Sequence, residues 1–161
     1  MGARIEVDIG SGPGEAEPWG EVRVTGGDLS GTVVGGAEIP NLIDELPLVA
    51  VAGALARGKT VIKDARELRV KESDRIASMV ANLESAGVSV TETEDGMEVT
   101  GPARMTSPAA ARSYGDHRVA MSMAVLALHS KEAICVNNIA CVDTSYPAFW
   151  DDLRKLGGHV E

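Results

Sequence analysis

A repeated order of elements constrains the fold of this chain more than any other feature of its sequence. A helix, a strand, a loop, a second helix, a glycine and a further strand follow one another twice. The segment 54–64 is similar to 126–138, and 83–90 is similar to 153–160. Two copies of an α-β-α-β unit predict an array of similar subdomains. The last strand of a hairpin is present in only one copy, so we expect the array to be incomplete.

The composition agrees with a layered α/β fold. The 161 residues are enough for one domain with a core or for a piece of a larger protein. Hydrophobic residues make up 44% of the chain but aromatic residues only 3%. The core must therefore be built from aliphatic side chains and methionine, which suits helices packed on sheets.

The charge and the cysteines exclude several classes of protein. The formal net charge of −9 argues against binding to nucleic acid or to an acidic membrane, both of which require a basic face. Cys135 and Cys141 lack the spacing of a metal site or of a disulfide scaffold. The sequence contains no bilayer-spanning run and no signal peptide, so we expect a cytosolic protein. A small anionic ligand is still compatible with this composition.

Hydrophobic periodicity and turn residues predict the individual elements. An alternating pattern predicts the first strand, and Asp95-Gly96 is a strong hairpin signal. We expect strands at 3–9, 21–25, 32–34, 60–63, 88–93, 97–100 and 133–137. We expect helices at 43–57, from Asp74 to Gly87, at 116–129 and from 144–147 to Gly157, with loops at 11–20 and 102–112. The sequence of the third helix is apolar nearly all round, which predicts a central and buried helix.

The segment Leu68–Ile76 combines a helix start with opposite charges. Lys71, Glu72 and Arg75 lie within one helical turn, and Ser73 and Asp74 are good helix caps. The positive end of a helix favours anions, and the two cations would add to that effect. The alternative is a solvated helix start with an ordinary ion pair.

Four polar clusters lie at predicted helix starts. They are Asp44-Glu45, Lys71-Glu72-Arg75, Asp116-His117-Arg118 and Thr144-Ser145. If the helices pack side by side, their amino ends form one anion site with a proton acceptor and a proton donor in Asp44 and Glu72. We expect the guanidinium groups of Arg75 and Arg118 to lie close together there.

Each member also has a purely structural explanation. Asp44 and Asp116 could be helix caps, Glu72 could only pair with Arg75, and His117 could be an ordinary helix-start histidine. Arg118, on an otherwise apolar helix, requires a partner, which Asp116 or a ligand could provide. Residue spacing alone predicts an anion site and no particular reaction.

Four motifs resemble those of the 5-enolpyruvylshikimate-3-phosphate (EPSP) synthase family. They are IDELP at 43–47, LRVKESDR at 68–75, YGDHRVAM at 114–121 and TSYPAFW at 144–150, in the order of that family. The resemblance implies a two-domain enzyme whose domains are inside-out α/β barrels of repeated βαβαββ units. This chain resembles the C-terminal part of the second domain, with approximate units at 1–101 and 102–161. The N-terminal domain and a glycine-rich segment would then be absent.

The resemblance also implies a reaction, the transfer of the enolpyruvyl group of phosphoenolpyruvate to the 5-hydroxyl of shikimate 3-phosphate, without a metal or organic cofactor. Position by position, Asp44 would bind the shikimate hydroxyls and accept a proton, and Glu72 would exchange a proton with the enolpyruvyl carbon. Arg75 and Arg118 would clamp phosphoenolpyruvate, with His117 assisting. Lys71 would contact the shikimate substrate.

Two positions depart from the family pattern. Glu67 stands where some members have an asparagine beside the shikimate ring. Asp143 stands near a position where many members have a lysine that contacts phosphoenolpyruvate, which leaves the role of the last motif open.

Three interpretations follow. In the first, the chain is the ligand-binding part of this transferase, and its isolated form has no turnover. In the second, it is a folded fragment that only binds ligand weakly or complements the missing N-terminal domain. The third is a relative acting on UDP-N-acetylglucosamine, against which the charged motifs speak.

Overall fold

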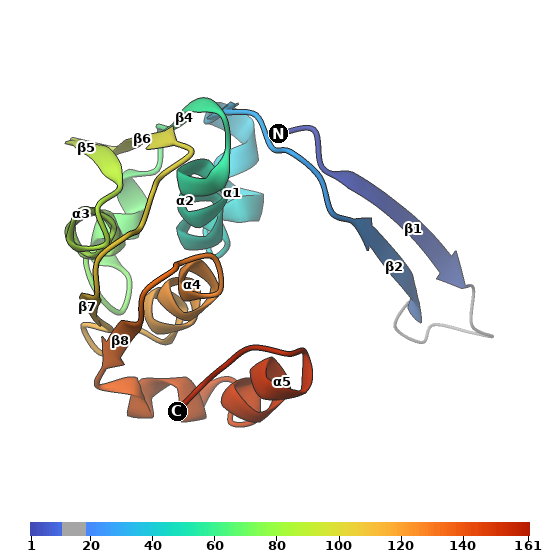
Figure 1. Cartoon of the computed structure of the whole chain (residues 1–161). Helices are drawn as coiled ribbons and strands as arrows, with labels where there is room; N and C mark the ends of the chain where they lie inside the picture. The colour runs from blue at the N-terminus through green and yellow to red at the C-terminus, as the bar shows by residue number, and fades with distance from the viewer. Residues whose placement is uncertain (11–18) are drawn as a thin grey trace.

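Three separate sheets and a group of helices make up the chain in a computed structural model, which describes residues 1–10 and 19–161 (Figure 1). The strands are β1 Arg4–Gly10, β2 Trp19–Thr25, β3 Val33–Val34, β4 Gly58–Ile62, β5 Ser89–Thr93, β6 Gly96–Gly101, β7 Ala109–Arg112 and β8 Ile134–Asn137. The helices are α1 Ile39–Leu42, α2 Leu46–Leu55, α3 Arg75–Ser85, α4 His117–Ala127 and α5 Phe149–Lys155. Short 3-10 helices lie at Gly36–Glu38, Arg66–Val70 and Ile139–Thr144.

The largest sheet has the strand order β3-β4-β6-β5 and belongs to a β-α-β-α-β-β run from β3 to β6. β3 and β4 are parallel, whereas β6 is antiparallel to both of its neighbours. The hairpin expected around Asp95-Gly96 is confirmed. A Cβ at Gly96 would collide with the backbone oxygen of Ile62, so this close strand pairing requires glycine.

The second copy of the repeat is represented by the parallel pair β7-β8, with α4 between the two strands. The predicted loop at 102–112 was therefore wrong at its end, since Ala109–Arg112 is β7. A run of three alanines carries no β-branched or aromatic signal, and β7 exists because β8 pairs with it. The predicted α/β class is confirmed, and the three sheets of the described residues do not close into a barrel.

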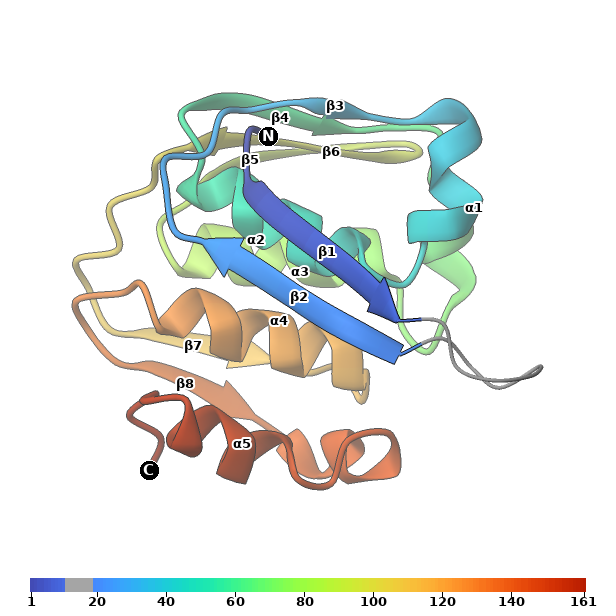
Figure 2. The same cartoon turned by 90° about the vertical axis from the view of Figure 1, so that its right-hand side faces the viewer.

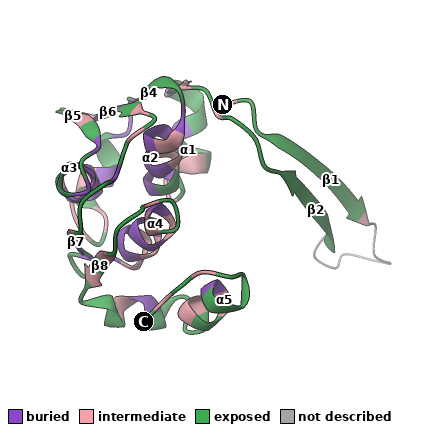
Figure 3. Ribbon diagram, viewed as in Figure 1, coloured by how far each residue is buried: buried purple, intermediate pink, exposed green. Residues whose placement is uncertain are grey.

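Aliphatic and methionine side chains form the core, as the low aromatic content predicted (Figure 3). The core lies where α2, α3 and α4 pack against one another and on the sheets. Its fully buried members include Leu46, Ile62, Leu68, Ile76, Met79, Leu83, Met97, Val99, Val119, Met123 and Leu126.

The helix expected at 43–57 is shorter at both ends. α1 ends at Leu42, a turn follows, and α2 begins at Leu46, with Pro47 in its first turn, where no N–H is required. α2 ends at Leu55 because Ala56 is extended. Its sequence is apolar all round, so periodicity could not identify the buried side, and Leu48 is 41% exposed.

The last two helices also differ from expectation. α5 begins at Phe149 rather than at 144–147, because Pro147 disfavours a helical conformation in the preceding residue. α4 is shorter than the expected 116–129, but its six buried residues confirm a central helix, with Met121 and Val125 half-buried. In the predicted loop at 11–20, residues 11–18 lie outside the described residues, and Trp19 and Gly20 belong to β2.

The β1-β2 hairpin projects away from the helices in Figure 1 and therefore lies in front of them in Figure 2, where that side faces the viewer. Strand alternation places five aliphatic side chains on one of its faces. They are Ile5, Val7, Ile9, Val22 and Val24, each 56–68% exposed. The described part of the chain therefore leaves this apolar face uncovered. Within the same described ranges, none of the helices has the length and apolarity that crossing a membrane requires.

Two leucines test where the core lies. Leu83 in α3 is 0% exposed, whereas Leu156 after α5 is 85% exposed. We expect Leu83→Ala to lower the free energy of unfolding by about 2–5 kcal/mol, because it leaves a cavity in the core. Leu156→Ala is the matched control and should change it by less than about 0.5 kcal/mol. Urea unfolding followed by circular dichroism measures both, and similar losses would contradict the assigned core.

Candidate anion-binding site

Three of the four polar clusters lie at helix starts, as expected. Glu45, Asp74 and Asp116 are the residues that immediately precede α2, α3 and α4. These three helices contact one another, and hydrogen bonds between residues at their starts show that their amino ends meet. The expectation for Thr144-Ser145 was wrong, because Thr144 ends a 3-10 helix and its hydroxyl donates to the backbone oxygen of Cys141.

Arg75 is the centre of the cluster, with a side chain that is only 1% exposed. Its Nε lies 2.7 Å from Oδ2 of Asp116, and its Nη1 lies 3.0 Å from Oδ1 of Asp44. Its Nη2 lies 2.6 Å from Oε2 of Glu72. Each nitrogen of the buried guanidinium thus donates to a different carboxylate, which is the pairing that a buried charge requires.

Arg118 reaches the same place from α4. Its Nη2 lies 3.4 Å from Oδ2 of Asp44, and its Nη1 lies 3.0 Å from the backbone oxygen of that residue. The same Nη1 lies 3.1 Å from Oε1 of Glu45. Arg75 and Arg118 share the Asp44 carboxylate, so the expected convergence of the two guanidinium groups is confirmed. Arg118 is the more accessible of the two, with 29% of its side chain exposed.

The partner expected for the Arg118 guanidinium was Asp116 or a ligand, and the structure corrects the first of these. Asp44 and Glu45 hold that guanidinium, whereas Asp116 accepts a hydrogen bond from the backbone N–H of Arg118. Sequence analysis missed the part played by Glu45. Its position directly after Asp44 and before a helix was the available signal, but that position alone also fits an ordinary surface glutamate.

The carboxylate of Asp116 joins α3 to α4. It is 0% exposed and caps α4 by accepting from the N–H groups of Arg118 and Val119. Its other oxygen accepts from Arg75 and from the hydroxyl of Ser73, which lies at 3.2 Å. Ser73 is therefore not a cap. Asp74 is, because it accepts from the backbone N–H of Ala77 at 3.0 Å.

The remaining expected residues surround this network. Lys71 Nζ lies 2.6 Å from Oε1 of Glu67, whose side chain is 65% exposed. His117 is the first residue of α4 and is half-buried. Asp143 is exposed in a 3-10 helix.

The site contains more carboxylates than cations, so its net charge is negative. Three cations, Lys71, Arg75 and Arg118, pair with five carboxylates, those of Asp44, Glu45, Glu67, Glu72 and Asp116. The pKa of Asp44 is lowered from its ordinary value, first by the hydrogen bond from Arg75 and then by the charge of Arg118. Burial works against the charge of Arg75, but hydrogen bonds to Asp116 and Asp44 outweigh it and raise its pKa. Both groups are therefore charged at neutral pH.

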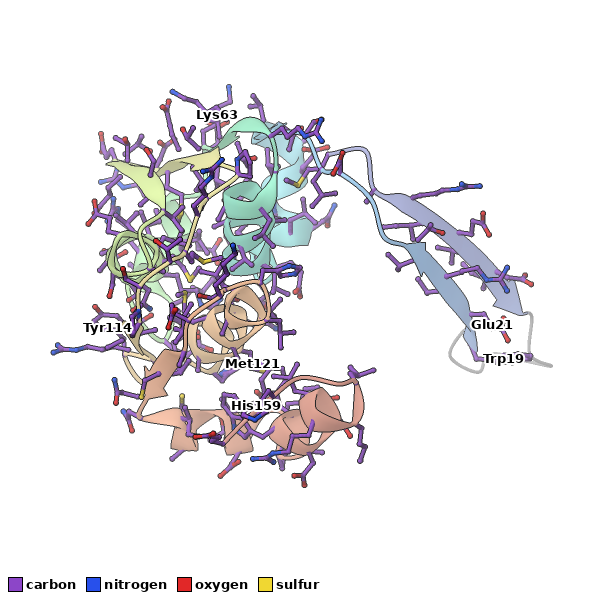
Figure 4. All side chains as sticks on the ribbon, viewed as in Figure 1. Trp19, Glu21, Lys63, Tyr114, Met121 and His159 are labelled. Carbon is purple, nitrogen blue, oxygen red and sulfur yellow. The ribbon has the colours of Figure 1, made fainter. Side chains whose placement is uncertain are left out.

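An apolar cavity of about 230 Å³ opens beside these charges. Asp44, Glu45 and Arg118 line its polar end. Its apolar wall comes from α2, α4 and the segment that leads into α5, and includes Leu48, Met121, Val125, Tyr146 and Phe149. Met121 lies between α4 and the C-terminal segment (Figure 4). The site can thus hold an anionic group against an apolar surface. A second cavity, of about 520 Å³, lies among Arg112, Tyr114, Asn137 and Asn138 and includes none of the candidate site residues.

The buried pair of Asp116 and Arg75 should contribute strongly to stability. We expect Asp116→Asn to lower the free energy of unfolding by roughly 3 kcal/mol, because Arg75 keeps its charge and loses its buried partner. The exposed Asp143 provides the control, since Asp143→Asn makes the same chemical change and should have almost no effect. Guanidinium unfolding measures the difference, and equal stabilities of the two variants would contradict the buried network.

The lowered pKa of Asp44 predicts a pH effect of definite sign. A carboxyl with a lowered folded-state pKa stabilises the fold above its ordinary value of 3.8, and that contribution is lost as the pH falls through the lowered value. Wild type should therefore lose more stability than Asp44→Asn between about pH 6 and about pH 3. Urea unfolding at both pH values provides the comparison. The ¹³C shift of the Asp44 carboxyl should titrate below 3.8, and a midpoint at or above that value would refute the assignment.

Comparison with known proteins identifies the family. A model of the EPSP synthase (3-phosphoshikimate 1-carboxyvinyltransferase) family matches residues 1–153. The 3-phosphoshikimate 1-carboxyvinyltransferase of Akkermansia muciniphila is 49% identical over 157 residues, which are 97% of this chain and 36% of that protein. The protein of the same name from Geotalea daltonii is 50% identical over 133 residues, which are 83% of this chain and 31% of that protein.

Solved structures agree with these relatives. EPSP synthase from Acinetobacter baumannii superposes with a TM-score of 0.92 at 34% identity, covering 100% of this chain and 38% of that protein. The enolpyruvyl transferase NikO from Streptomyces tendae shares the fold, with a TM-score of 0.71 at 22% identity over 96% of this chain and 33% of that protein. This chain thus spans about a third of the length of the relatives it matches, and it belongs to the EPSP synthase family.

Proposed function

We propose that this chain supplies one wall of an EPSP synthase active site. The reaction is transfer of the enolpyruvyl group from phosphoenolpyruvate to the 5-hydroxyl of shikimate 3-phosphate. The observation that supports it most directly is the meeting of Arg75, Arg118 and Asp44, which come from three separate motifs, at the starts of three helices. Both substrates carry phosphate and phosphoenolpyruvate also carries a carboxylate, and a planar guanidinium binds both kinds of group.

Arg118 and Arg75 contribute differently in this proposal. Arg118 is partly exposed and lines the cavity, so it can contact phosphoenolpyruvate directly. Arg75 is enclosed by three carboxylates, so a ligand reaches it only if Asp44 or Glu72 moves aside. Its main contribution is to orient those two carboxylates.

The acid and base assignments follow from exposure and charge. Asp44 is ionised and 47% exposed, so it can accept a hydrogen bond or a proton from a substrate hydroxyl. Glu72 is 49% exposed and held by Arg75 through one oxygen, so its other oxygen can carry the proton that is exchanged with the enolpyruvyl carbon. Lys71 and Glu67 would lie on the shikimate side, and His117 would assist from the start of α4.

The remaining part of the enzyme would complete the site. In this proposal the chain is the C-terminal part of the second domain, with units at about 1–101 and 102–161, and the protein acts in the cytosol. The chain spans 36% of the Akkermansia relative, and two apolar surfaces of the described residues are open. These are the hairpin face and the cavity wall, and both suit contact with the other part of the enzyme.

Reconstitution tests this proposal. We expect no sustained phosphate release from the isolated chain with both substrates, because much of the site is missing. Adding the complementary N-terminal segment of the same enzyme should restore release. Sustained turnover by the chain alone would show that the site is complete without the other segment. Failure of a well-folded reconstituted complex to turn over, or calorimetric binding of UDP-N-acetylglucosamine in place of shikimate 3-phosphate, would refute the proposed reaction.

The reconstituted complex also tests Arg118. Loss of a charged hydrogen-bond pair typically costs about 1.5–3 kcal/mol. We therefore expect Arg118→Ala to weaken phosphoenolpyruvate binding about tenfold or more. Arg154→Ala, an exposed arginine of α5, is the control and should bind as wild type does. Unchanged affinity in Arg118→Ala would assign Arg118 a structural role.

A further inference from the structure

We propose that Glu45 competes with the anionic substrate for Arg118 and thereby sets the affinity of the site. The proposal rests on the function proposed above and adds a residue for which neither a motif nor a comparison assigns a role. Its carboxylate Oε1 lies 3.1 Å from Nη1 of Arg118, and both residues line the apolar cavity. An incoming anion and this carboxylate therefore require the same guanidinium.

Among the carboxylates that pair with Arg75 or Arg118, Glu45 is the one that can leave most easily. Asp44 is held by both Arg75 and Arg118, Glu72 by Arg75 at 2.6 Å, and Asp116 is fully buried. The Glu45 side chain is 53% exposed, and Arg118 is its only side-chain partner in residues 1–10 and 19–161. Glu45 precedes α2, yet its side chain forms no capping hydrogen bond. Its side-chain contacts thus tie it to Arg118 alone.

Arg118 would stay in place when Glu45 leaves. The backbone oxygen of Asp44 accepts from Nη1 at 3.0 Å, and the Asp44 carboxylate lies 3.4 Å from Nη2. Exchange of Glu45 for a ligand oxygen therefore replaces one contact of an already oriented guanidinium. Such exchange requires no rearrangement of the buried Arg75 network.

The local charge gives a reason for the exchange. The site holds five carboxylates and three cations, so a further anion would add to an existing excess of negative charge. Movement of one carboxylate into solvent relieves part of this repulsion. An exposed ion pair is worth little, so the penalty that Glu45 imposes on the ligand corresponds to an affinity change of about two- to fivefold.

Titration of the isolated chain with phosphoenolpyruvate, and separately with inorganic phosphate, tests the inference. The Nε–Hε signals of the arginines in ¹H–¹⁵N spectra report binding even at millimolar dissociation constants. We expect Glu45→Gln to bind phosphoenolpyruvate about two- to fivefold more tightly than wild type, with the largest shift on Arg118. Glu45→Asp keeps the charge on a shorter side chain and should give a smaller gain.

Glu21→Gln is the matched control, because it changes the net charge equally at a site on the hairpin, away from the helices (Figure 4). It should bind phosphoenolpyruvate as wild type does. An equal gain of affinity in Glu21→Gln would show that the overall charge of the chain causes the effect, and this would overturn the inference. Unchanged or weaker binding by Glu45→Gln and Glu45→Asp, with wild-type unfolding curves, would also overturn it while leaving the anion site intact. Absence of binding in every variant would refute both the anion site and the competition.

Discussion

The buried guanidinium of Arg75 is the constraint on which the rest of the structure depends. A charge that is 1% exposed is tolerated only because three carboxylates surround it. Those carboxylates come from the start of α2, from the segment before α3 and from the start of α4. The helices must therefore keep their mutual positions for the charge to stay paired. One network thus joins the starts of three helices and also positions the charged groups of the candidate site.

The sequence was most informative where local chemistry decides the structure. The Asp74 cap and the Asp95-Gly96 turn depend on contacts within a few residues, and both were predicted. The meeting of Arg75 with Arg118 could also be predicted, because helix starts gather at one end of a repeated α/β unit. The residues that carry the family motifs and the residues of the network are largely the same.

The remaining features depend on partners that are distant in the sequence. β7 is a strand because β8 lies beside it, and its alanines carry no signal of their own. The buried side of α2 is set by its neighbours, since every side of that helix is apolar. The bond from Arg75 to Asp116 was not predicted, because the sequence suggested Asp116 only as a helix cap or as a partner of Arg118. Residue spacing limits the possible pairings, and only the packing of α3 on α4 selects among them.

The β1-β2 hairpin has a practical consequence for any laboratory that handles this chain. It is a two-stranded ribbon in which the outer edge of each strand has no partner strand among the described residues, and five of its aliphatic side chains face water. Such ribbons recruit further strands from neighbouring molecules, which is how ordered aggregates begin. Aggregation of the purified chain will thus increase with its concentration. A substitution in β1 or β2 that prevents pairing with a further strand should reduce this aggregation.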